Sequence, residues 1–282
     1  MQPVLIVGCG DIGRRVGHRY HNAGHPVVGL VRSEASAAAL QEAGCHAVAA
    51  DLDHGGEAQR PEPGGLLYWF APPPPGGQRD PRIGRYLDAI PPGEEPARVV
   101  LISTSAVYGD QDGATVTEAT PASPGSDRGR RRLDAEHTLT RWAEERGVAA
   151  VILRVSGIYG PGRLPLERIA RGEPILRPED SGLTNRIHAD DLAEIAVLAG
   201  AADAPVGIVN VADGRPRPTA AYFDAVADAH GLPHPPRIDL AEARRHFTPT
   251  FLEMLTESRA LDITRLRTTF GFEPRPFDPT SG

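Results

Sequence analysis

Short apolar runs alternate, through the first 156 residues, with longer stretches whose apolar positions follow a helical spacing. The strand-length runs are PVLIVG (3–8), PVVGLV (26–31), HAVAA (46–50), LLYWFA (66–71), RVVLIS (98–103) and AAVILRV (149–155). Helical stretches follow the first two runs, at residues 11–24 and 33–44. Continuous apolar strands separated by helices are typical of a parallel sheet covered on both faces. The pattern therefore predicts an α/β fold built on a doubly wound parallel sheet.

The alternation weakens after residue 156. The further elements that the pattern predicts are a helix at 190–200, a strand at 207–213 and helical pieces at 219–231 and 248–262. A chain of 282 residues is long enough for a large core and a smaller annex. We therefore expect residues 1–156, with 186–212 returning to them, to form the sheet domain. Residues 157–185 and 213–282 are expected to form a smaller second part.

Composition argues against several classes of protein. The formal net charge is −7, which disfavours general binding to nucleic acid or to an anionic membrane. The sequence contains no basic leader and no apolar stretch of about 18 residues, so we expect a soluble, cytoplasmic protein. The two cysteines, Cys9 and Cys45, do not form a C-x-x-C pair, and no cluster has metal-ligand spacing. Neither a disulfide framework nor a metal site is predicted.

A glycine-rich turn joins the first predicted strand to the first helix. Its residues are Gly8, Cys9, Gly10, Asp11, Ile12 and Gly13, a G-x-G-x-x-G between strand and helix. In that setting the first glycine makes a tight turn, the second lets the backbone approach a diphosphate, and the third lets the helix pack on the strand. The motif predicts a Rossmann-type dinucleotide site, and the alternative is a turn without a ligand. We expect Cys9 to be a small packing residue.

The end of the second strand bears on the choice of dinucleotide. NAD sites usually carry an acid there, about 20 residues after the glycines, which binds the ribose 2′-hydroxyl. This strand ends in Val31, and Arg32 and Ser33 then favour a 2′-phosphate, hence NADP over NAD. Glu34 argues mildly for NAD, and the alternative for Arg32 is a solvated loop residue. Asp51, just after the third strand, is expected near the adenine or as the cap of a turn.

Three later motifs follow the glycine turn in order, ISTSAVYG (102–109), RVSGIYGPG (154–162) and IHADDL (187–192). Together they resemble the extended short-chain dehydrogenase/reductase family, the NAD-dependent epimerase/dehydratase group, over nearly the whole chain. The resemblance implies a Rossmann domain with a substrate-binding C-terminal part. It also implies redox chemistry at a hydroxyl or ketone carbon, often of nucleotide sugars, and a homodimer as one assembly.

The same resemblance implies catalytic positions. The family has a Ser or Thr where Thr104 stands, and a Y-x-x-x-K on the next helix. The Tyr exchanges the substrate proton, while the Lys lowers the Tyr pKa and holds the nicotinamide ribose. Aligning the family's L-x-x-E with Leu133 and Glu136 puts Arg132 at the Lys position and Arg128 at the Tyr position. A guanidinium cannot exchange protons near neutral pH, so the centre resembles that of atypical members.

Four arginines crowd the start of that helix, in GSDRGRRRLDAE (125–136), and all 30 basic residues of the chain are arginines. Cations in a first helical turn are unfavourable, because that end of a helix carries partial positive charge. Arg128 and Arg132 are four residues apart and share a helix face. We hypothesise that they meet anionic groups of the cofactor, the substrate or a neighbouring carboxylate. The alternative is a surface ladder in which Arg131 pairs with Asp127 and Arg132 with Glu136.

The C-terminal part supplies further candidates. By resemblance, the strand in TNRIHADD lines the substrate cleft, so Asn185 and Arg186 are predicted to anchor a phosphate or carboxylate. Tyr108 and Tyr159 follow strands at the edge where open α/β sheets bind ligands. They are candidate substrate contacts, and the alternative at these glycine-flanked positions is a structural role. His188 is expected to be a packed, hydrogen-bonded residue rather than a catalyst.

The combined prediction is an NADP-binding oxidoreductase of the epimerase/dehydratase type with an atypical catalytic centre. Its substrate is expected to be a small polar, anionic or sugar-like hydroxyl or carbonyl compound. Thr104 would orient the reacting oxygen and Arg132 the nicotinamide ribose, while Arg128 and Arg186 would bind the substrate. Two alternatives stay open. One is a non-catalytic NADP(H)-binding regulator or sensor, and the other is an epimerase or isomerase that retains its cofactor through the cycle.

Overall fold

The computed structural model describes residues 1–42, 46–53 and 58–281. Its contacts divide the chain into two compact units. The first unit comprises Met1–Thr104, Asp127–Arg154 and Leu192–Val209, and the second comprises Ser105–Ser126, Val155–Asp191 and Asn210–Gly282. Within the described ranges, no helix is both long enough and apolar enough to cross a membrane.

A seven-stranded sheet forms the centre of the first unit, in the order β12-β7-β5-β4-β1-β2-β3. Its strands are β1 (Val4–Val7), β2 (Val27–Val31), β3 (Ala47–Ala49), β4 (Leu66–Trp69), β5 (Arg98–Thr104), β7 (Ala149–Val155) and β12 (Gly207–Val211). β1 pairs in parallel with β2 and β4, β2 with β3, and β4 with β5. Each predicted apolar run before residue 156 forms one of these strands. The prediction of a doubly wound, Rossmann-type sheet is confirmed.

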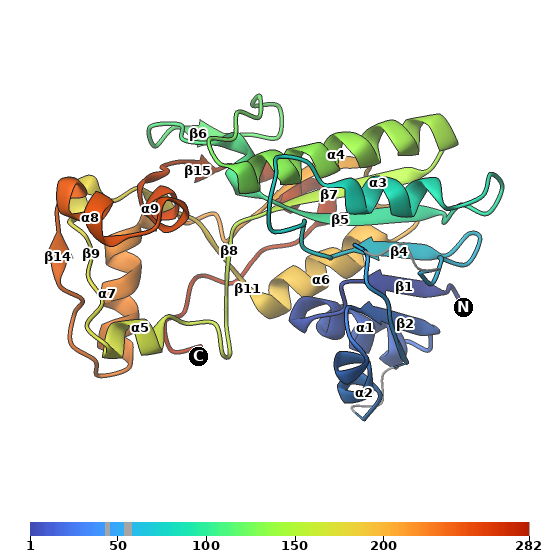
Figure 1. Ribbon diagram of the computed structural model, residues 1–282, viewed down its shortest axis with the longest axis horizontal. Helices are drawn as coiled ribbons and strands as arrows, with labels where there is room; N and C mark the ends of the chain where they lie inside the picture. Colours follow the sequence, from blue (N-terminus) through green and yellow to red (C-terminus); the bar gives the residue numbers. More distant parts are fainter. Residues whose placement is uncertain (43–45, 54–57, 282) are drawn as a thin grey trace. The chain divides into compact units, whose positions relative to one another are not determined.

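Helices cover both faces of this sheet (Figure 1). One face carries α3 (Pro81–Asp88) and α4 (Asp127–Arg146), and the other carries α1 (Asp11–Asn22), α2 (Glu34–Glu42) and α6 (Ala189–Gly200). On β4, Leu67 and Trp69 pack into the core beside α3, and Tyr68 donates its hydroxyl to the Ala196 carbonyl of α6 at 3.1 Å. Successive strand residues point to opposite faces, so a strand covered on both sides is apolar throughout.

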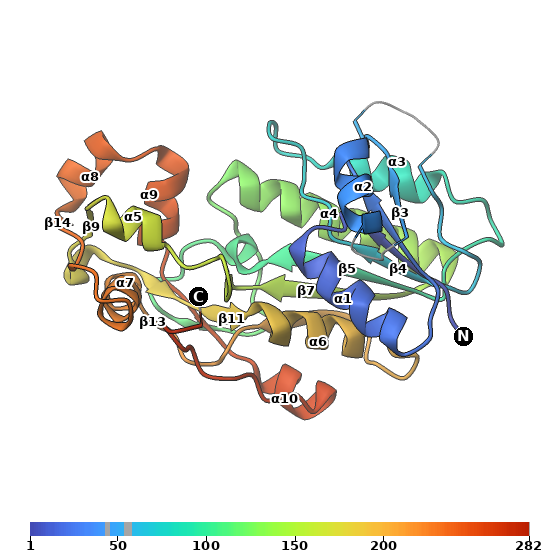
Figure 2. The same ribbon diagram turned by 90° about the horizontal axis from the view of Figure 1, so that it is seen from below.

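Short paired strands and helices make up the second unit (Figure 2). The parallel pairs are β8 (Gly157–Tyr159) with β11 (Arg186–His188), β9 (Ile175–Leu176) with β14 (Arg237–Ile238), and β6 (Thr115–Val116) with β15 (Ala260–Leu261). β10 (Leu183–Thr184) pairs antiparallel with β13 (Arg217–Pro218). The α-helices are α5 (Leu166–Ala170), α7 (Thr219–Ala229), α8 (Leu240–His246), α9 (Pro249–Thr256) and α10 (Thr264–Phe270). The 3-10 turns are η1 (Ser105–Tyr108) and η2 (Pro178–Asp180).

The predicted helical piece at 248–262 is wrong in its second half. α9 ends at Thr256, and Glu257 leaves the helical conformation with a φ of −54° and a ψ of 126°. The Ser258 N–H then donates to Oδ1 of Asp110 at 2.9 Å, and β15 pairs with β6. These partners lie far away in the sequence, so the local pattern of apolar positions did not reveal the strand.

Candidate dinucleotide-binding and catalytic site

The glycine turn lies between β1 and α1 and rests on the neighbouring strand ends. The N–H groups of Gly8 and Cys9 both donate to the Leu30 carbonyl of β2, at 2.9 and 3.0 Å, and the Gly10 N–H donates to the Gly8 carbonyl at 2.7 Å. Gly8 has a φ of +87°, and a Cβ there would lie 2.3 Å from the Ala71 nitrogen. Only glycine allows this conformation together with this approach. The first glycine of the motif therefore makes a tight turn.

Two other residues of the turn hold α1 close to the sheet. A Cβ at Gly13 would lie 3.1 Å from Cγ2 of Ile6, so the third glycine lets α1 pack tightly on β1. Cys9 is buried, and a Cβ at Gly29 would lie 2.8 Å from its Sγ. The Cys9 thiol thus fills the space between the turn and β2, as expected of a packing residue. Cys45 lies outside the described residues.

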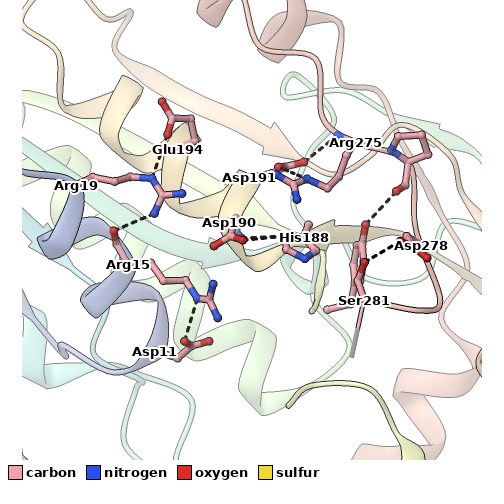
Figure 3. A network of polar contacts seen from close by, with 12 residues as sticks. Asp11, Arg15, Arg19, His188, Asp190, Asp191, Glu194, Arg275, Asp278 and Ser281 are labelled. Carbon is pink, nitrogen blue, oxygen red and sulfur yellow. Dashed lines mark hydrogen bonds and ion pairs between the residues drawn. The ribbon is translucent and has the colours of Figure 1, made fainter. Parts of the chain in front are cut away.

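The second glycine of the motif faces open space. A Cβ at Gly10 would meet no atom within 4 Å. α1 starts at the next residue, and its N-cap residue, Gly10, supplies no side-chain hydrogen bond. The first N–H groups of a helix have no partner inside the helix itself. Asp11 pairs with Arg15 one turn along, at 3.0 Å (Figure 3). An open backbone beside the start of a helix fits a diphosphate, because the N–H groups and the helix dipole both favour an anion.

The ends of β2 and β3 carry the residues predicted to select the dinucleotide. The Arg32 side chain is 78% exposed, and its Nε lies 4.0 Å from Oδ2 of Asp51. Asp51 also accepts the Asp53 N–H at 2.9 Å, so it stabilises a turn. The Ser33 hydroxyl accepts the Ser36 N–H at 3.3 Å near the start of α2. Arg32 is therefore accessible to a ligand, whereas Ser33 and Asp51 each hold local backbone.

Arg132 ties α4 to the carboxyl ends of two strands. Its Nη1 donates to the Ile102 carbonyl of β5 at 3.1 Å and to the Ala71 carbonyl beyond β4 at 3.3 Å. Burial lowers the pKa of the Arg132 guanidinium to about 10, with the Asp80 carboxylate opposing that shift. The side chain therefore stays charged at neutral pH. Thr104 is the last residue of β5 and is partly buried.

The other arginines at the start of α4 have different surroundings. Arg128 is exposed, and among the described residues its side chain makes no hydrogen bond or ion pair. Arg130 pairs with Asp127 at 2.8 Å, and Arg131 donates to the Gly77 carbonyl at 2.6 Å. The alternative surface ladder paired Arg131 with Asp127, and that pairing is wrong, because Arg130 occupies that carboxylate. Arg128 is left as the exposed cation of this segment.

Glu136 does not pair with Arg132, which makes the second pair of the predicted ladder wrong too. Its carboxylate accepts from Arg154 of β7, at 2.8 Å from Nη2, and from the Ser103 hydroxyl of β5 at 2.5 Å. Glu136, Arg154 and Ser103 are all buried. This network was not predicted from the sequence. Its signal was the arginine within the apolar run AAVILRV, because a buried charge requires a partner.

In the second unit, both candidate tyrosines are fully buried. The Tyr108 hydroxyl donates to Oδ1 of Asn210 at 2.7 Å. The Tyr159 hydroxyl donates to the Pro276 carbonyl at 3.1 Å. Both hydroxyls are engaged within the protein, which favours the structural alternative. A role of either tyrosine in substrate binding stays a prediction.

Asn185 and Arg186 are neighbours in sequence with different surroundings. The Asn185 side chain is buried, donates to the Arg259 carbonyl at 2.8 Å and accepts the Leu261 N–H at 3.0 Å. It therefore holds the segment that leads into β15. The Arg186 guanidinium stacks on the ring of Tyr222, 3.7 Å from the ring centroid. Unlike the Asn185 amide, the Arg186 guanidinium makes no hydrogen bond to a described residue.

His188 is a packed residue, as expected. It is buried, its ring meets that of Tyr159 edge to face at 5.1 Å, and its Nδ1 accepts the Asp190 N–H at 3.1 Å. Figure 3 shows His188 beside Asp190, and Asp191 paired with Arg275. Asp191 accepts from the Arg275 backbone N–H and from its Nε, at 2.8 and 2.7 Å. His188 therefore supports the start of α6, and Asp191 holds the C-terminal segment.

The parallel sheet and the glycine turn define the first unit as a Rossmann-type domain with a candidate dinucleotide site. Residues 87–212 match the model of the NAD dependent epimerase/dehydratase family. Residues 4–63 also match the model of ketopantoate reductase PanE/ApbA. The matched segment, which contains β5, α4 and α6, is therefore similar to the NAD-dependent epimerase/dehydratase family.

Three curated relatives are similar to parts of the chain. A dTDP-6-deoxy-L-talose 4-dehydrogenase (NAD(P)(+)) of Kitasatospora kifunensis is 26% identical over 68% of this chain and 62% of its own length. Protein YeeZ of Escherichia coli K12 is 31% identical over 49% of this chain and 48% of its own length. A 2'-dehydrokanamycin reductase of Streptomyces kanamyceticus is 31% identical over 49% of this chain and 43% of its own length. The chain thus covers less than two thirds of each relative.

Solved structures match over almost the full chain. A conserved protein of unknown function from Silicibacter pomeroyi DSS has a TM-score of 0.83 and 28% identity, and the match covers 99% of this chain and 96% of that one. A UDP-glucuronic acid 4-epimerase from Bacillus cereus, solved in complex with NAD, has a TM-score of 0.77 and 17% identity with the same coverage. At that identity the second likeness shows the fold.

Proposed function

We propose that this protein is an NAD(P)-dependent oxidoreductase that acts on a small polar, anionic or sugar-like hydroxyl or carbonyl compound. The observation that carries the proposal is the glycine turn, in which Gly8 closes tightly while Gly10 leaves open space at the start of α1. The named relatives include a sugar-nucleotide dehydrogenase and a reductase of an aminoglycoside, which supports redox chemistry on sugar-like compounds. A cytoplasmic location and a homodimeric assembly remain predictions.

The glycine turn would hold the diphosphate of the dinucleotide, and Arg32 would bind a ribose 2′-phosphate. We therefore propose NADP as the preferred cofactor. Arg32 is exposed at the end of β2, and its neighbour Asp51 lies at a distance of 4.0 Å rather than in a close ion pair. A bound nicotinamide supplies or accepts a hydride. Arg132, charged and fixed at the ends of β4 and β5, would bind the adjoining ribose.

Thr104 and Arg128 are the proposed contacts to the reacting compound in the first unit. The Thr104 hydroxyl at the end of β5 would orient the reacting oxygen by a hydrogen bond. Arg128 would bind an anionic group of substrate or cofactor, since it is exposed and has no partner among the described residues. Both residues would position the compound rather than transfer its proton, because guanidinium groups and hydroxyls are poor general acids and bases.

The arginine at the family's tyrosine position favours a second candidate function, a dinucleotide-binding regulator or sensor without turnover. Both candidates require cofactor binding, but only the oxidoreductase transfers a hydride to a second compound. Transfer of deuterium from labelled NADPH to members of a panel of keto sugars and keto acids, followed by mass spectrometry, separates them. An epimerase that retains its cofactor would instead copurify with NADP and show no net consumption.

The glycine turn itself is tested by Gly10→Val. Because a Cβ at Gly10 meets no atom of the described residues within 4 Å, the variant should unfold at the same urea concentration as wild type. The added side chain fills the open space, so NADPH should bind at least about tenfold more weakly in calorimetry. Gly76→Ala is the matched control, since its Cβ also meets no atom within 4 Å and it lies outside the motif. Unchanged NADPH affinity in Gly10→Val would refute the site.

The preference for NADP is tested by Arg32→Ala. Loss of a charge-assisted contact to a 2′-phosphate should weaken NADPH binding about tenfold or more and leave NADH binding unchanged. Arg141→Ala, which removes an exposed arginine from α4, controls for the change in net charge. If wild-type protein binds NADH more tightly than NADPH, the preference is wrong while the dinucleotide site stands.

A further inference from the structure

Arg186 is held against an aromatic ring and a glycine, with no acid bound to it. Its guanidinium lies 3.7 Å from the ring centroid of Tyr222 on α7. A Cβ at Gly157, its strand partner on β8, would lie 2.6 Å from Nη1 of Arg186. The Nε is buried without a hydrogen-bond partner, and no described residue makes a hydrogen bond to the rest of the guanidinium. The charge is therefore oriented by packing alone.

A second arginine in the same unit is held in the same way. The guanidinium of Arg217 on β13 lies 4.6 Å from the ring centroid of Phe277, and its Nε is likewise buried without a partner. The rings of Phe277 and Tyr222 touch, with their centroids 5.1 Å apart. The two guanidinium groups thus rest on two neighbouring rings.

The charges around this pair do not balance. The Asp213 carboxylate raises the pKa of Arg186, and the charge of Arg217 lowers the pKa of Asp213. Asp213 is buried, accepts the backbone N–H of Arg215 at 3.0 Å, and has no hydrogen bond to either guanidinium. Burial lowers the pKa of Arg186, and the charge of Arg217 lowers it further. Burial also raises the pKa of Asp213. The cluster therefore carries an excess of positive charge that its own acid compensates poorly.

We propose that Arg186 and Arg217, supported by Tyr222 and Phe277, form a binding subsite for an oxyanion, a carboxylate or a phosphate of the substrate. Stacking on a ring fixes the plane of a guanidinium, and a fixed plane is what bidentate binding of an oxyanion needs. An incoming oxyanion would supply the missing negative charge and partners for the remaining N–H groups. That the oxyanion belongs to a substrate rests on the proposed function, but binding of the oxyanion itself does not require the dinucleotide.

Arg217 is a member of this subsite that no sequence motif marks. Arg217 follows the strand β12 in the segment GRPRPT, and its position carries no motif. Asn185 beside Arg186 does not join the subsite, because its amide is engaged by the backbone of Arg259 and Leu261. The pair of arginines, not the Asn-Arg dipeptide, is therefore the proposed anchor.

The test is calorimetry of the full chain with inorganic phosphate, with lactate as a carboxylate and with glycerol as a neutral control. Wild-type protein should bind phosphate, lactate or both at one site, and should not bind glycerol. The ion that binds identifies the source of the oxyanion. Arg186→Gln and Arg217→Gln should each weaken that binding at least about tenfold, because each removes charge-assisted hydrogen bonds. Arg245→Ala, an exposed arginine on α8, should leave it unchanged.

Conservative variants keep the test decisive if a glutamine variant does not fold. Arg186→Lys and Arg217→Lys keep the positive charge but lose the planar set of N–H donors of the guanidinium. Each lysine variant should therefore bind the oxyanion more weakly than wild type does. NADPH binding, measured on the same samples, should be unchanged, because the glycine turn belongs to the first unit. Absence of saturable oxyanion binding to wild type, or equal binding to wild type and both arginine variants, would overturn the subsite. Loss of NADPH binding in wild type would overturn the proposed function instead.

Discussion

Replacing Glu136 with glutamine should destabilise the first unit strongly. Glu136, Arg154 and Ser103 are 2%, 4% and 3% exposed, and the Glu136 carboxylate accepts from Nε and Nη2 of Arg154 and from the Ser103 hydroxyl. Glu136→Gln keeps the shape of the side chain and removes its charge. The guanidinium of Arg154 then remains buried without the carboxylate that it binds in wild type, and breaking a buried ion pair costs about 3–5 kcal/mol. That is a large share of the roughly 5–15 kcal/mol by which domains are stable.

Urea unfolding measures this loss. The matched control is Glu194→Gln, which breaks the pair between Glu194 and Nε of Arg19 at 3.0 Å, with side chains 47% and 30% exposed (Figure 3). An exposed pair contributes less than about 1 kcal/mol, because water screens it and because two long side chains must be ordered. The double variant Glu136→Leu with Arg154→Met should recover most of the lost stability, since apolar residues of similar size remove both charges. Equal losses for Glu136→Gln and Glu194→Gln would refute the reasoning.

Three other substitutions have distinct expected outcomes. Gly8→Ala puts a methyl group 2.3 Å from the Ala71 nitrogen at a φ of +87°. Urea unfolding should show a loss of more than about 2 kcal/mol in the free energy of unfolding, and calorimetry should show a loss of NADPH binding. Wild-type values of both quantities would contradict the turn geometry. Asp80→Asn keeps the N-cap of α3, where the Asp80 carboxylate accepts a backbone N–H. Burial raises the pKa of Asp80 above 3.8, so the folded state binds that proton more tightly than the unfolded chain, and wild-type stability falls as pH rises from 3.8 through the raised pKa. In thermal unfolding across pH, the melting temperature of the variant relative to wild type should be higher near neutral pH than below pH 3.8, where the two should be equal. A difference in melting temperature that does not depend on pH would contradict this. Tyr108→Phe leaves Oδ1 of Asn210 without its 2.7 Å donor, which should cost about 1–3 kcal/mol with unchanged NADPH affinity; a changed affinity would place Tyr108 in the site.

The sheet was predictable because its signal is local. Strands covered on both faces are apolar at every position, so runs such as LLYWFA identify themselves without knowledge of their neighbours. The glycine turn is local too, since the spacing of Gly8, Gly10 and Gly13 relative to β1 and α1 is contained in one short segment. The structure adds the reason for each glycine. Gly8 meets the backbone of Ala71, and Gly13 meets Ile6.

The partners of polar side chains were not predictable, because they are set by tertiary contacts. The local i,i+4 rule paired Glu136 with Arg132, whereas the carboxylate takes Arg154 of β7 and Ser103 of β5. A buried arginine in an apolar strand must be compensated, but its position in sequence does not say by which acid. Asn185 shows the same limit, since the backbone that engages its amide lies more than 70 residues further along the chain.

The alignment of L-x-x-E with Leu133 and Glu136 predicts that Arg132 stands at the family's lysine position, and the two side chains differ in shape. A lysine ammonium has all its N–H donors on one nitrogen, whereas the five N–H donors of a guanidinium lie on three nitrogens. Nη1 of Arg132 donates hydrogen bonds to the carbonyls of Ile102 and Ala71. These bonds fix the side chain at the ends of β5 and β4. Its other nitrogens need not serve that anchor. Arg132 can therefore combine a structural contact with the ribose contact proposed for it, whereas Arg128, exposed one turn earlier, is better suited to a mobile anion.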